Sequence, residues 1–331
     1  MNGGGLSVGT MAVRYLYGRW DRESDVGIRP MRHRLALLLL AGLLLTACGS
    51  LTDLLAFHPD DSYILPSEAL PPGTDEVFLE TEDGIPIQAL HLRNPSSDTV
   101  TIYFHGNAGN IYHRLDDYRR LRRLGTSVFA VSYRGYAKSR GWPHEAGIYR
   151  DGKAALDHVT TVMGIPASRI FVLGRSIGST VATDLAQDKD IAGLILVSPL
   201  SSARDQAEAM GLAFAAPLAG EAFENGEKIK RLKAPLLVIH GTRDRTVPIG
   251  MGRKVFDAAT GRKFFQEIEG AGHNDLSTRY GDSYWTGLYG ADLETPIMPQ
   301  SLLSASAARK RFNAGWAIAN SLDVDPEIVP Q

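Results

Sequence analysis

The chain has 331 residues and a net charge of −2, with 44% hydrophobic and 22% charged residues, so we expect it to fold around a large apolar core. This charge balance does not suggest a nucleic-acid partner. The single cysteine, Cys48, excludes an internal disulfide and a cysteine-rich metal site.

The start of the chain predicts a processed leader. Met31-Arg32-His33-Arg34 is basic, and an unbroken apolar run from Leu35 to Leu45 follows. Those eleven residues would rise only about 16 Å as a helix, whereas a bilayer core is about 30 Å thick. The pattern is therefore typical of a secretory signal over residues 31–47. Residues 1–30 fit neither a signal nor a domain, and a true start at Met31 would explain them.

The ending Leu-Thr-Ala-Cys48 resembles the lipobox of bacterial lipoproteins. That resemblance implies cleavage before Cys48, with diacylglycerol on its sulfur and an acyl chain on its new amine, a lipid anchor to a membrane. Gly49 in place of an Asp favours the outer membrane of the bacterial cell envelope, if the cell has one. The alternative is an uncleaved anchor with an ordinary buried cysteine. We expect residues 48–73 to form a lipidated tether that packs loosely on the domain.

From residue 74 the sequence alternates between predicted strands and helices. Residues 77–80 and 87–92 alternate apolar and polar side chains around a turn, which predicts an antiparallel hairpin. The later strands are continuous apolar runs, which indicates a parallel sheet buried on both faces. These strands are 100–104, 128–131, 170–173, 194–197, 236–239 and 264–268, with helices at 112–124, 145–163, 179–186 and 255–259. The expected fold is α/β, a mostly parallel, doubly wound sheet of about eight strands, over a domain spanning 74–288.

The sequence Gly174-Arg175-Ser176-Ile177-Gly178 lies between the strand 170–173 and the helix that follows. This order of strand, sharp turn and helix is typical of a nucleophile elbow, which strains its central residue and leaves no room for side chains two positions before and after it. Ser176 is therefore the candidate nucleophile. A turn with no chemistry is the alternative, because the pentapeptide alone occurs by chance.

A serine nucleophile needs a base, and the base needs an orienting acid. In folds with this elbow the acid and then the histidine follow the serine along the chain, on loops at the carboxyl ends of strands. His273 follows the strand 264–268 in a glycine-rich loop, and Asp244 follows the strand 236–239. We predict Ser176, Asp244 and His273 as the catalytic group. A core histidine and a helix-capping aspartate are the alternatives for the last two.

Acyl transfer also needs donors for a developing oxyanion. His105-Gly106-Asn107-Ala108-Gly109-Asn110 follows the strand 100–104, and its small residues let the backbone approach the nucleophile. We predict the backbone amides of Asn107 and Ile177 as the oxyanion donors. We interpret His105 as a structural loop residue, because it precedes Ser176 in the chain.

With these motifs, residues 77–284 resemble the α/β-hydrolase superfamily. The likeness is closest to a compact single-domain branch that carries the His105–Asn110 loop and the segment Tyr133-Arg134-Gly135-Tyr136, and that includes membrane-associated depalmitoylases. Where that branch continues with Gly-x-Ser, this chain has Ala137-Lys138-Ser139. The resemblance implies two-step hydrolysis through an acyl-enzyme, without a metal or an organic cofactor.

The substrate is less constrained than the chemistry. The short lid between Pro199 and Pro235 contains an apolar run, 210–218, that could wall a pocket for a small-molecule or lipid-like acyl group, although core packing explains it equally well. The function that we expect is hydrolysis of carboxylic esters or thioesters, and two other functions are alternatives to it. One is a serine peptidase of the same superfamily, and the other is a catalytically silent scaffold lipoprotein. Residues 289–331 form a C-terminal extension of unassigned role.

Overall fold

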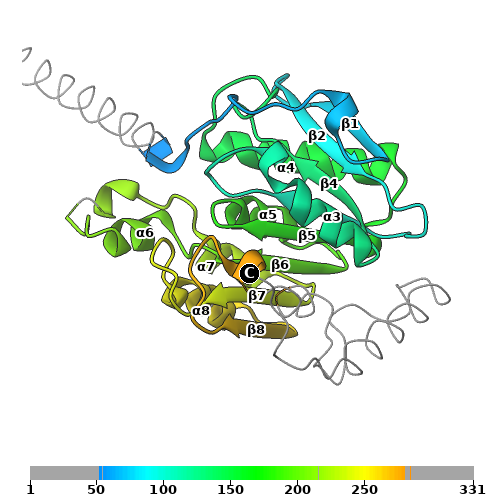
Figure 1. Ribbon diagram of the computed structural model, residues 1–331. Coiled ribbons are helices and arrows are strands. Elements are labelled where there is room, and N and C mark those ends of the chain that lie inside the picture. The colour runs from blue at the N-terminus through cyan, green and yellow to red at the C-terminus, as the bar shows by residue number, and fades with distance from the viewer. Residues whose placement is uncertain (1–51, 54, 215, 280–283, 285–331) are drawn as a thin grey trace, which may run out of the picture. The chain divides into compact units, whose positions relative to one another are not determined.

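The computed structural model describes residues 52–53, 55–214, 216–279 and 284, all within one compact unit, Thr52–Gln331. The predicted leader and the C-terminal extension lie outside the described residues. Eight strands form one sheet (Figure 1). They are β1 (Thr74–Glu80), β2 (Pro86–Leu92), β3 (Val100–Phe104), β4 (Ser127–Val131), β5 (Ile170–Arg175), β6 (Gly193–Val197), β7 (Leu236–Gly241) and β8 (Lys263–Ile268).

The strand order is β1-β2-β4-β3-β5-β6-β7-β8. The β1–β2 and β2–β4 pairs are antiparallel and the other five pairs are parallel, which confirms the expected antiparallel start of a mostly parallel sheet. The main helices are α3 (Leu115–Arg123), α4 (Glu145–Asp157), α5 (Gly178–Ala186), α6 (Ala203–Ala209) and α8 (Ile249–Ala258). Shorter helices are α7 (Asn225–Lys228) and α9 (Leu276–Arg279).

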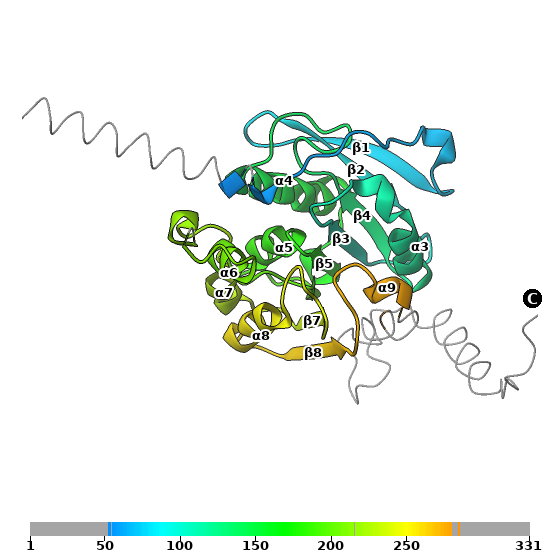
Figure 2. The same cartoon turned by 60° about the vertical axis from the view of Figure 1, so that its left-hand side comes forward.

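The central strands are buried on both faces, as their unbroken apolar sequences require. Along β3, Ile102 and Phe104 pack into one apolar cluster with side chains of α4, α5 and α8. Tyr103 packs into a second cluster with the apolar face of α3. Figure 2 shows the sheet between these two helical layers. Because parallel strands end at the same edge, the loops after β3, β5, β7 and β8 meet there.

One predicted helix was too short. We expected residues 255–259, whereas α8 begins at Ile249, directly after Pro248. Gly250 and Gly252 lower the intrinsic helix propensity of the first turn. The fold nevertheless requires Gly252, because a Cβ there would overlap Nδ1 of the buried His240 ring. Close packing on the end of β7 therefore decides where α8 starts.

The predicted tether also differs from expectation. Residues 57–63 do not pack loosely on the domain, because Phe57 is 3% exposed and its ring lies edge-on to that of Phe223 at 5.9 Å. Main-chain groups of the same segment bond to the loops after β3 and β4. One buried apolar side chain, Phe57, thus fixes a segment that sequence composition presents as a linker.

The loop after β4 is held by a buried ion cluster. The Arg134 guanidinium, 3% exposed, lies 2.8 Å from Asp151 Oδ1 on α4 and 2.8 Å from Asp83 Oδ2 in the β1–β2 turn. In the same loop, the Tyr133 hydroxyl donates to the His105 carbonyl at 2.9 Å. The Tyr-Arg-Gly-Tyr motif therefore joins the hairpin, α4 and the loop after β3.

Ala137 follows this motif with a φ of 46°, in the left-handed region that favours glycine. Ala137 is buried in the apolar cluster that also contains Tyr103, so its methyl group is packed while its backbone is strained. We expect Ala137→Gly to stabilise the fold by at most about 0.5 kcal/mol, because relief of the left-handed conformation slightly exceeds the sum of the entropy that glycine adds to the unfolded chain and the loss of one buried methyl group. Urea denaturation would measure this, with Ala130→Gly in β4 expected to destabilise. A lower stability of Ala137→Gly would contradict the argument.

Candidate active site

Ser176 lies in the turn between β5 and α5 with a φ of 53°. Its backbone N–H donates to the Val197 carbonyl of β6 at 2.9 Å, and its carbonyl accepts from Ser179 N at 2.9 Å. A serine in the left-handed region is strained, and strain of this kind persists only where surrounding bonds determine it. The two main-chain bonds supply that constraint and present the hydroxyl at the carboxyl edge of the sheet.

The flanking glycines are required by close approach. A Cβ on Gly174 would lie 2.6 Å from Cβ of Ala182 on α5. A Cβ on Gly178 would lie 2.6 Å from the His105 carbonyl. Both distances are well below van der Waals contact, so side chains at these positions would displace α5 from β5 or from the loop after β3. The Gly-x-Ser-x-Gly pattern is thus a packing requirement of the turn.

The structure brings Ser176, His273 and Asp244 together. His273 Nε2 lies 3.0 Å from Ser176 Oγ, and His273 Nδ1 lies 2.7 Å from Asp244 Oδ2. Because an ionised carboxylate only accepts hydrogen bonds, Nδ1 carries the proton and Nε2 is free to accept one from the serine. The three groups come from loops after three different strands, in the chain order expected from the sequence.

Asp244 is held as an anion. Burial alone raises the pKa of its carboxyl, but hydrogen bonds from His240 and His273 and from the Val247 amide outweigh burial and keep the pKa well below its usual range. Asp244 Oδ1 accepts from the amides of Thr246 and Val247 at 2.9 and 2.8 Å, while Oδ2 lies 2.7 Å from His273 Nδ1 and 3.5 Å from Nε2 of the buried His240. The carboxylate is therefore both charged and fixed in orientation.

The loop after β3 lies beside the nucleophile, since a Cβ on Gly106 would approach Ser176 Cβ to 3.4 Å. Among the residues that the structure describes, no acceptor engages the backbone N–H of Asn107 or of Ile177. Ile177 is also the N-cap of α5, where the helix dipole favours negative charge. Both amides therefore meet one requirement of an oxyanion donor, an N–H group without a protein acceptor.

His105 is buried and structural in this arrangement. Its Nδ1 lies 2.7 Å from the Gly106 carbonyl, and burial lowers its pKa to about 3. The neutral ring packs at a tilt against Tyr133 and edge-on against Tyr136, at centroid distances of 4.6 and 5.3 Å. His105 makes no hydrogen bond to Ser176 among the described contacts, in keeping with the sequence interpretation.

Arg175 is a site residue that the sequence interpretation missed. Its Nη2 donates to the His273 carbonyl at 2.9 Å and to Asn274 Oδ1 at 3.1 Å, although Arg175 and His273 are 98 positions apart. The Arg243 amide also donates to the Ala271 carbonyl at 2.8 Å. The histidine loop is therefore bonded to both the elbow and the aspartate loop. The unspecified second position of Gly-x-Ser-x-Gly gave no signal for this contact.

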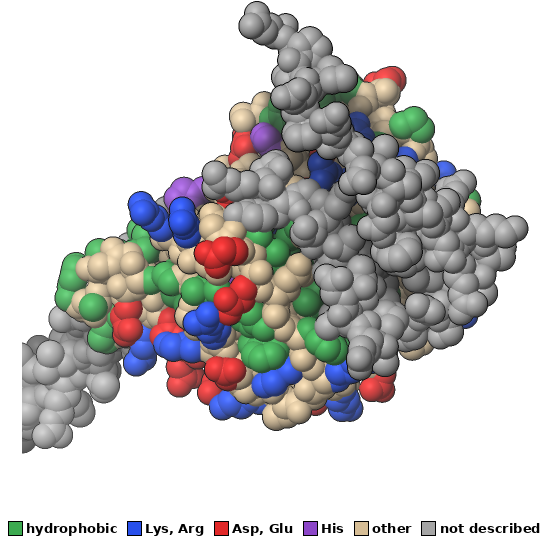
Figure 3. Space-filling model, turned by 60° about the horizontal axis from the view of Figure 1, so that its bottom comes forward, with side chains coloured by type: hydrophobic (Ala, Val, Ile, Leu, Met, Phe, Trp, Pro, Cys, Tyr) green, Lys and Arg blue, Asp and Glu red, His purple; other side chains and the backbone are tan. Residues whose placement is uncertain are grey.

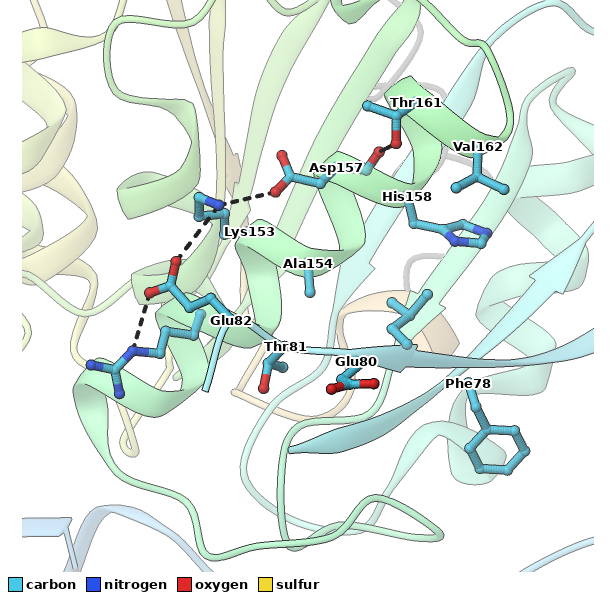
Figure 4. Close-up of a pocket in the computed structure, with 12 residues that line it drawn as sticks. Phe78, Glu80, Thr81, Glu82, Lys153, Ala154, Asp157, His158, Thr161 and Val162 are labelled. Carbon is cyan, nitrogen blue, oxygen red and sulfur yellow. Dashed lines mark hydrogen bonds and ion pairs between the residues drawn. The ribbon is translucent and has the colours of Figure 1, made fainter. Parts of the chain in front are cut away.

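Two hollows in the described structure lie away from these residues. One, of about 390 Å³, lies between β1 and α4 (Figure 4). Its Arg150 and Lys153 pair with Glu82 at 3.2 and 3.6 Å. The other, of about 900 Å³, lies beside the loop 135–142. Neither hollow is lined by Ser176, His273 or Asp244, so the volume of a hollow does not indicate where the candidate catalytic residues lie.

Charges on the described surface are mixed. Figure 3 shows acidic and basic side chains interspersed over the face that includes α8 and β8. Arg253 of α8 pairs with Glu267 of β8 at 2.7 Å, and Lys254 pairs with Asp205 at 2.9 Å. Pairing of this kind leaves little net field on this face.

The described residues contain no cluster of three or more His, Cys, Asp or Glu side chains arranged to bind a metal ion. Within the same residues, no helix combines the length and the apolar character needed to cross a membrane. Cys48, predicted as the lipidation site, lies outside the described part of the chain.

The fold and the site together define a doubly wound α/β protein with a serine at a strained elbow. Residues 95–227 match a family model described as serine aminopeptidase, S33. The α/β-hydrolase domain-containing protein WAV2 of Arabidopsis thaliana is 31% identical over 64% of this chain and 76% of that protein. The human α/β-hydrolase domain-containing protein 17B is 32% identical over 61% of this chain and 70% of that protein. The chain belongs to the α/β-hydrolase superfamily.

Solved structures agree in fold. An esterase from Pyrococcus furiosus aligns with a TM-score of 0.57 and 21% identity over 70% of this chain and 96% of that one. An α/β-hydrolase from Vibrio vulnificus aligns with a TM-score of 0.56 and 21% identity, over 66% of this chain and 82% of that one. At this identity the likeness concerns the architecture of the sheet and its helices.

The contacts of Arg175 should affect the rate at which Ser176 reacts, because they hold the loop that carries His273. We expect Arg175→Met to slow the reaction of Ser176 with a fluorophosphonate probe roughly tenfold, because small displacements of a base from its nucleophile reduce rates by such factors. The measurement is the second-order labelling rate followed by in-gel fluorescence. Arg245→Met, on the exposed part of the aspartate loop, is the control and should label at the original rate. Equal rates for both variants would show that Arg175 does not position the histidine loop.

Proposed function

We propose that this protein is a serine hydrolase that cleaves carboxylic esters or thioesters through a covalent acyl-enzyme. The observation that carries the proposal is the position of His273, within hydrogen-bond distance of both Ser176 Oγ and Asp244 Oδ2. A structural histidine would not need a serine on one nitrogen and a buried carboxylate on the other. Membership of the α/β-hydrolase superfamily supports the same reading.

In the first step, Ser176 Oγ bonds to the substrate carbonyl carbon while His273 Nε2 takes the hydroxyl proton. The carbonyl oxygen becomes an oxyanion that accepts from the amides of Asn107 and Ile177. The bond to the alcohol or thiol then breaks, and His273 returns the proton to that leaving group. Asp244 stabilises the imidazolium and fixes its tautomer. In the second step, water attacks the acyl-enzyme with His273 as base, which releases the acid and restores Ser176.

We infer that the substrates carry apolar acyl groups. The lid between β6 and β7 exposes large apolar side chains, with Phe214 at 84%, Met210 at 65% and Leu218 at 52% exposure. Leu55, just before the buried Phe57, is 64% exposed. Exposed apolar groups on a short lid are suited to contact an acyl chain or a lipid surface. The depalmitoylase-like branch noted in the sequence belongs to this proposal.

The proposed location follows from the sequence of residues 31–48. A lipid on Cys48 would anchor the domain in the bacterial cell envelope, at the outer membrane where the cell has one. The domain would then work close to acyl chains. Metabolic labelling with an alkyne fatty acid tests the anchor, since Cys48→Ser should abolish incorporation. Incorporation that persists in that variant would reject Cys48 as the site.

A peptidase is the second candidate, because the matching family model is described as serine aminopeptidase. The lid also carries acidic groups, which could pair with the amino terminus of a peptide substrate. Burial raises the pKa of Glu224, and the carboxylates of Asp205, Glu227 and Glu221 raise it further against the opposing effect of Arg204. Turnover of aminoacyl p-nitroanilides above that of p-nitrophenyl esters would favour the peptidase.

The nucleophile is tested by labelling. We expect the purified chain to react with a fluorophosphonate probe and Ser176→Ala to lose all labelling, because only the activated hydroxyl attacks phosphorus. Asp244→Asn should lose roughly 10³- to 10⁴-fold in kcat toward an ester, since it disturbs the histidine tautomer. Absence of labelling in a folded protein, judged by its circular dichroism spectrum and melting curve, would reject the hydrolase and favour the scaffold.

Substrate preference is tested by acyl length. We expect octanoyl p-nitrophenyl ester to be cleaved faster than the acetyl ester. Phe214→Ser should reduce the octanoyl-to-acetyl rate ratio about fivefold, because the octanoyl chain would lose its apolar contact with one aromatic side chain. Trp142→Ser is the matched control, because Trp142 is also exposed, at 60%, but lies in the loop after β4. A ratio near one in the original protein would contradict the acyl preference.

A further inference from the structure

Residues 57–63, which we call the strap, lie against the loop after β3, residues 105–110, which we call the oxyanion loop. The strap lies upstream of β1 in the chain and is followed by a single 3₁₀ turn, Ser67–Ala69, before that strand begins (Figure 1). The His58 amide donates to Asn107 Oδ1 at 2.7 Å, and His58 Nδ1 lies 2.7 Å from Asn107 Nδ2. A single strap residue therefore bonds to both polar atoms of the Asn107 side chain.

The orientation of Asn107 follows from its partners. Oδ1 faces two groups that can donate, the His58 N–H and the Tyr136 hydroxyl, the latter at 2.7 Å. Nδ2 is therefore the donor to His58, and His58 Nδ1 must be an acceptor without a proton. Every polar atom of the amide group has a partner, and two of the three bonds come from His58.

The far end of the oxyanion loop is bonded to the same strap. Asn110 Nδ2 donates to the Asp60 carbonyl at 3.1 Å and to the Tyr63 carbonyl at 2.9 Å. The Asp60 carbonyl also accepts from the Ala137 amide at 3.0 Å. With Phe57 buried against Phe223, the strap is fixed at both its ends and spans the oxyanion loop from Asn107 to Asn110.

The oxyanion loop needs such support. Between its two asparagines it contains only Ala108 and Gly109, and Gly109 has a φ of 70°, so small side chains leave its backbone conformation weakly determined. An oxyanion donor is effective only if its N–H direction is set before the reaction. The peptide that carries the proposed donor is held at its Gly106 carbonyl by His105 Nδ1, at 2.7 Å, and on its other side through the side-chain bonds of Asn107.

We propose that His58 is a positioning residue for catalysis, which acts through the Asn107 side chain to direct the Asn107 amide at the oxyanion. This inference rests on the proposed hydrolase function. It makes the segment between the predicted lipid anchor and the domain part of the active-site support. The binding of substrate does not depend on this contact, whereas stabilisation of the transition state does.

A double-mutant cycle tests the proposal in the full chain, with octanoyl p-nitrophenyl ester as substrate. His58→Leu removes the Nδ1 acceptor and preserves bulk, and we expect a five- to tenfold lower kcat with KM unchanged within twofold. Asn107→Ala should lower kcat roughly tenfold or more. If His58 acts through Asn107, the double variant should be no slower than Asn107→Ala, because neighbouring residues in one hydrogen-bond network are not additive.

His58→Asn is the rescue variant, because its Oδ1 lies the same number of bonds from the backbone as the histidine Nδ1 and also accepts hydrogen bonds. We expect it to restore most of the lost kcat. His158→Leu is the matched control, since His158 lines the hollow between β1 and α4 and should leave kcat unchanged. Fluorophosphonate labelling rates should fall in parallel with kcat, and thermal melting curves confirm that each variant is folded.

Unchanged kcat in His58→Leu, additive losses in the double variant, or a loss confined to KM would each overturn the positioning role. A wild-type protein that neither labels nor hydrolyses esters would reject the proposed function and this inference with it. An active wild type with a silent His58→Leu would reject this inference alone. The two failures are therefore distinguishable.

Discussion

The close packing of α5 against β5 and the oxyanion loop is the constraint on which the rest of the site depends. It permits only glycine at positions 174 and 178 and forces Ser176 into a left-handed conformation. The bond from the Ser176 amide to Val197 ties this strained residue to the neighbouring strand. The hydroxyl therefore has a fixed place at the carboxyl edge of the sheet, and every other candidate group is useful only through its distance from that place.

Long-range polar contacts supply those distances. The histidine loop is bonded to Arg175 in the elbow and to the loop of Asp244. The oxyanion loop is bonded to His58, far upstream in the chain, and to the motif around Tyr136. The histidine loop and the oxyanion loop contain few large apolar side chains, so hydrogen bonds rather than burial determine their conformations. The rigid sheet thus carries the site, and these contacts orient it.

The strap gives the N-terminal region a role beyond connection. Under the proposed function, the strap would follow the lipid anchor closely in the chain, and the exposed Phe214 of the lid would offer an apolar surface to acyl groups. Anchor, strap and lid would then present ester or thioester substrates to an oxyanion site that the strap itself supports. The acidic groups near Glu224 in the lid have no role in the proposed hydrolysis of esters or thioesters.

The sequence by itself determined the alternation of strands and helices, because each element carries its own apolar pattern, and it determined the candidate serine, acid and histidine, because chain order and the two glycines restrict them. The antiparallel start and the strand bounds agreed to within a few residues. Only the tertiary structure decided the start of α8, the left-handed Ala137, the Arg175 contact and the strap. These depend on close approach or on hydrogen bonds between residues up to 98 positions apart, and such contacts leave no periodic signal in the sequence.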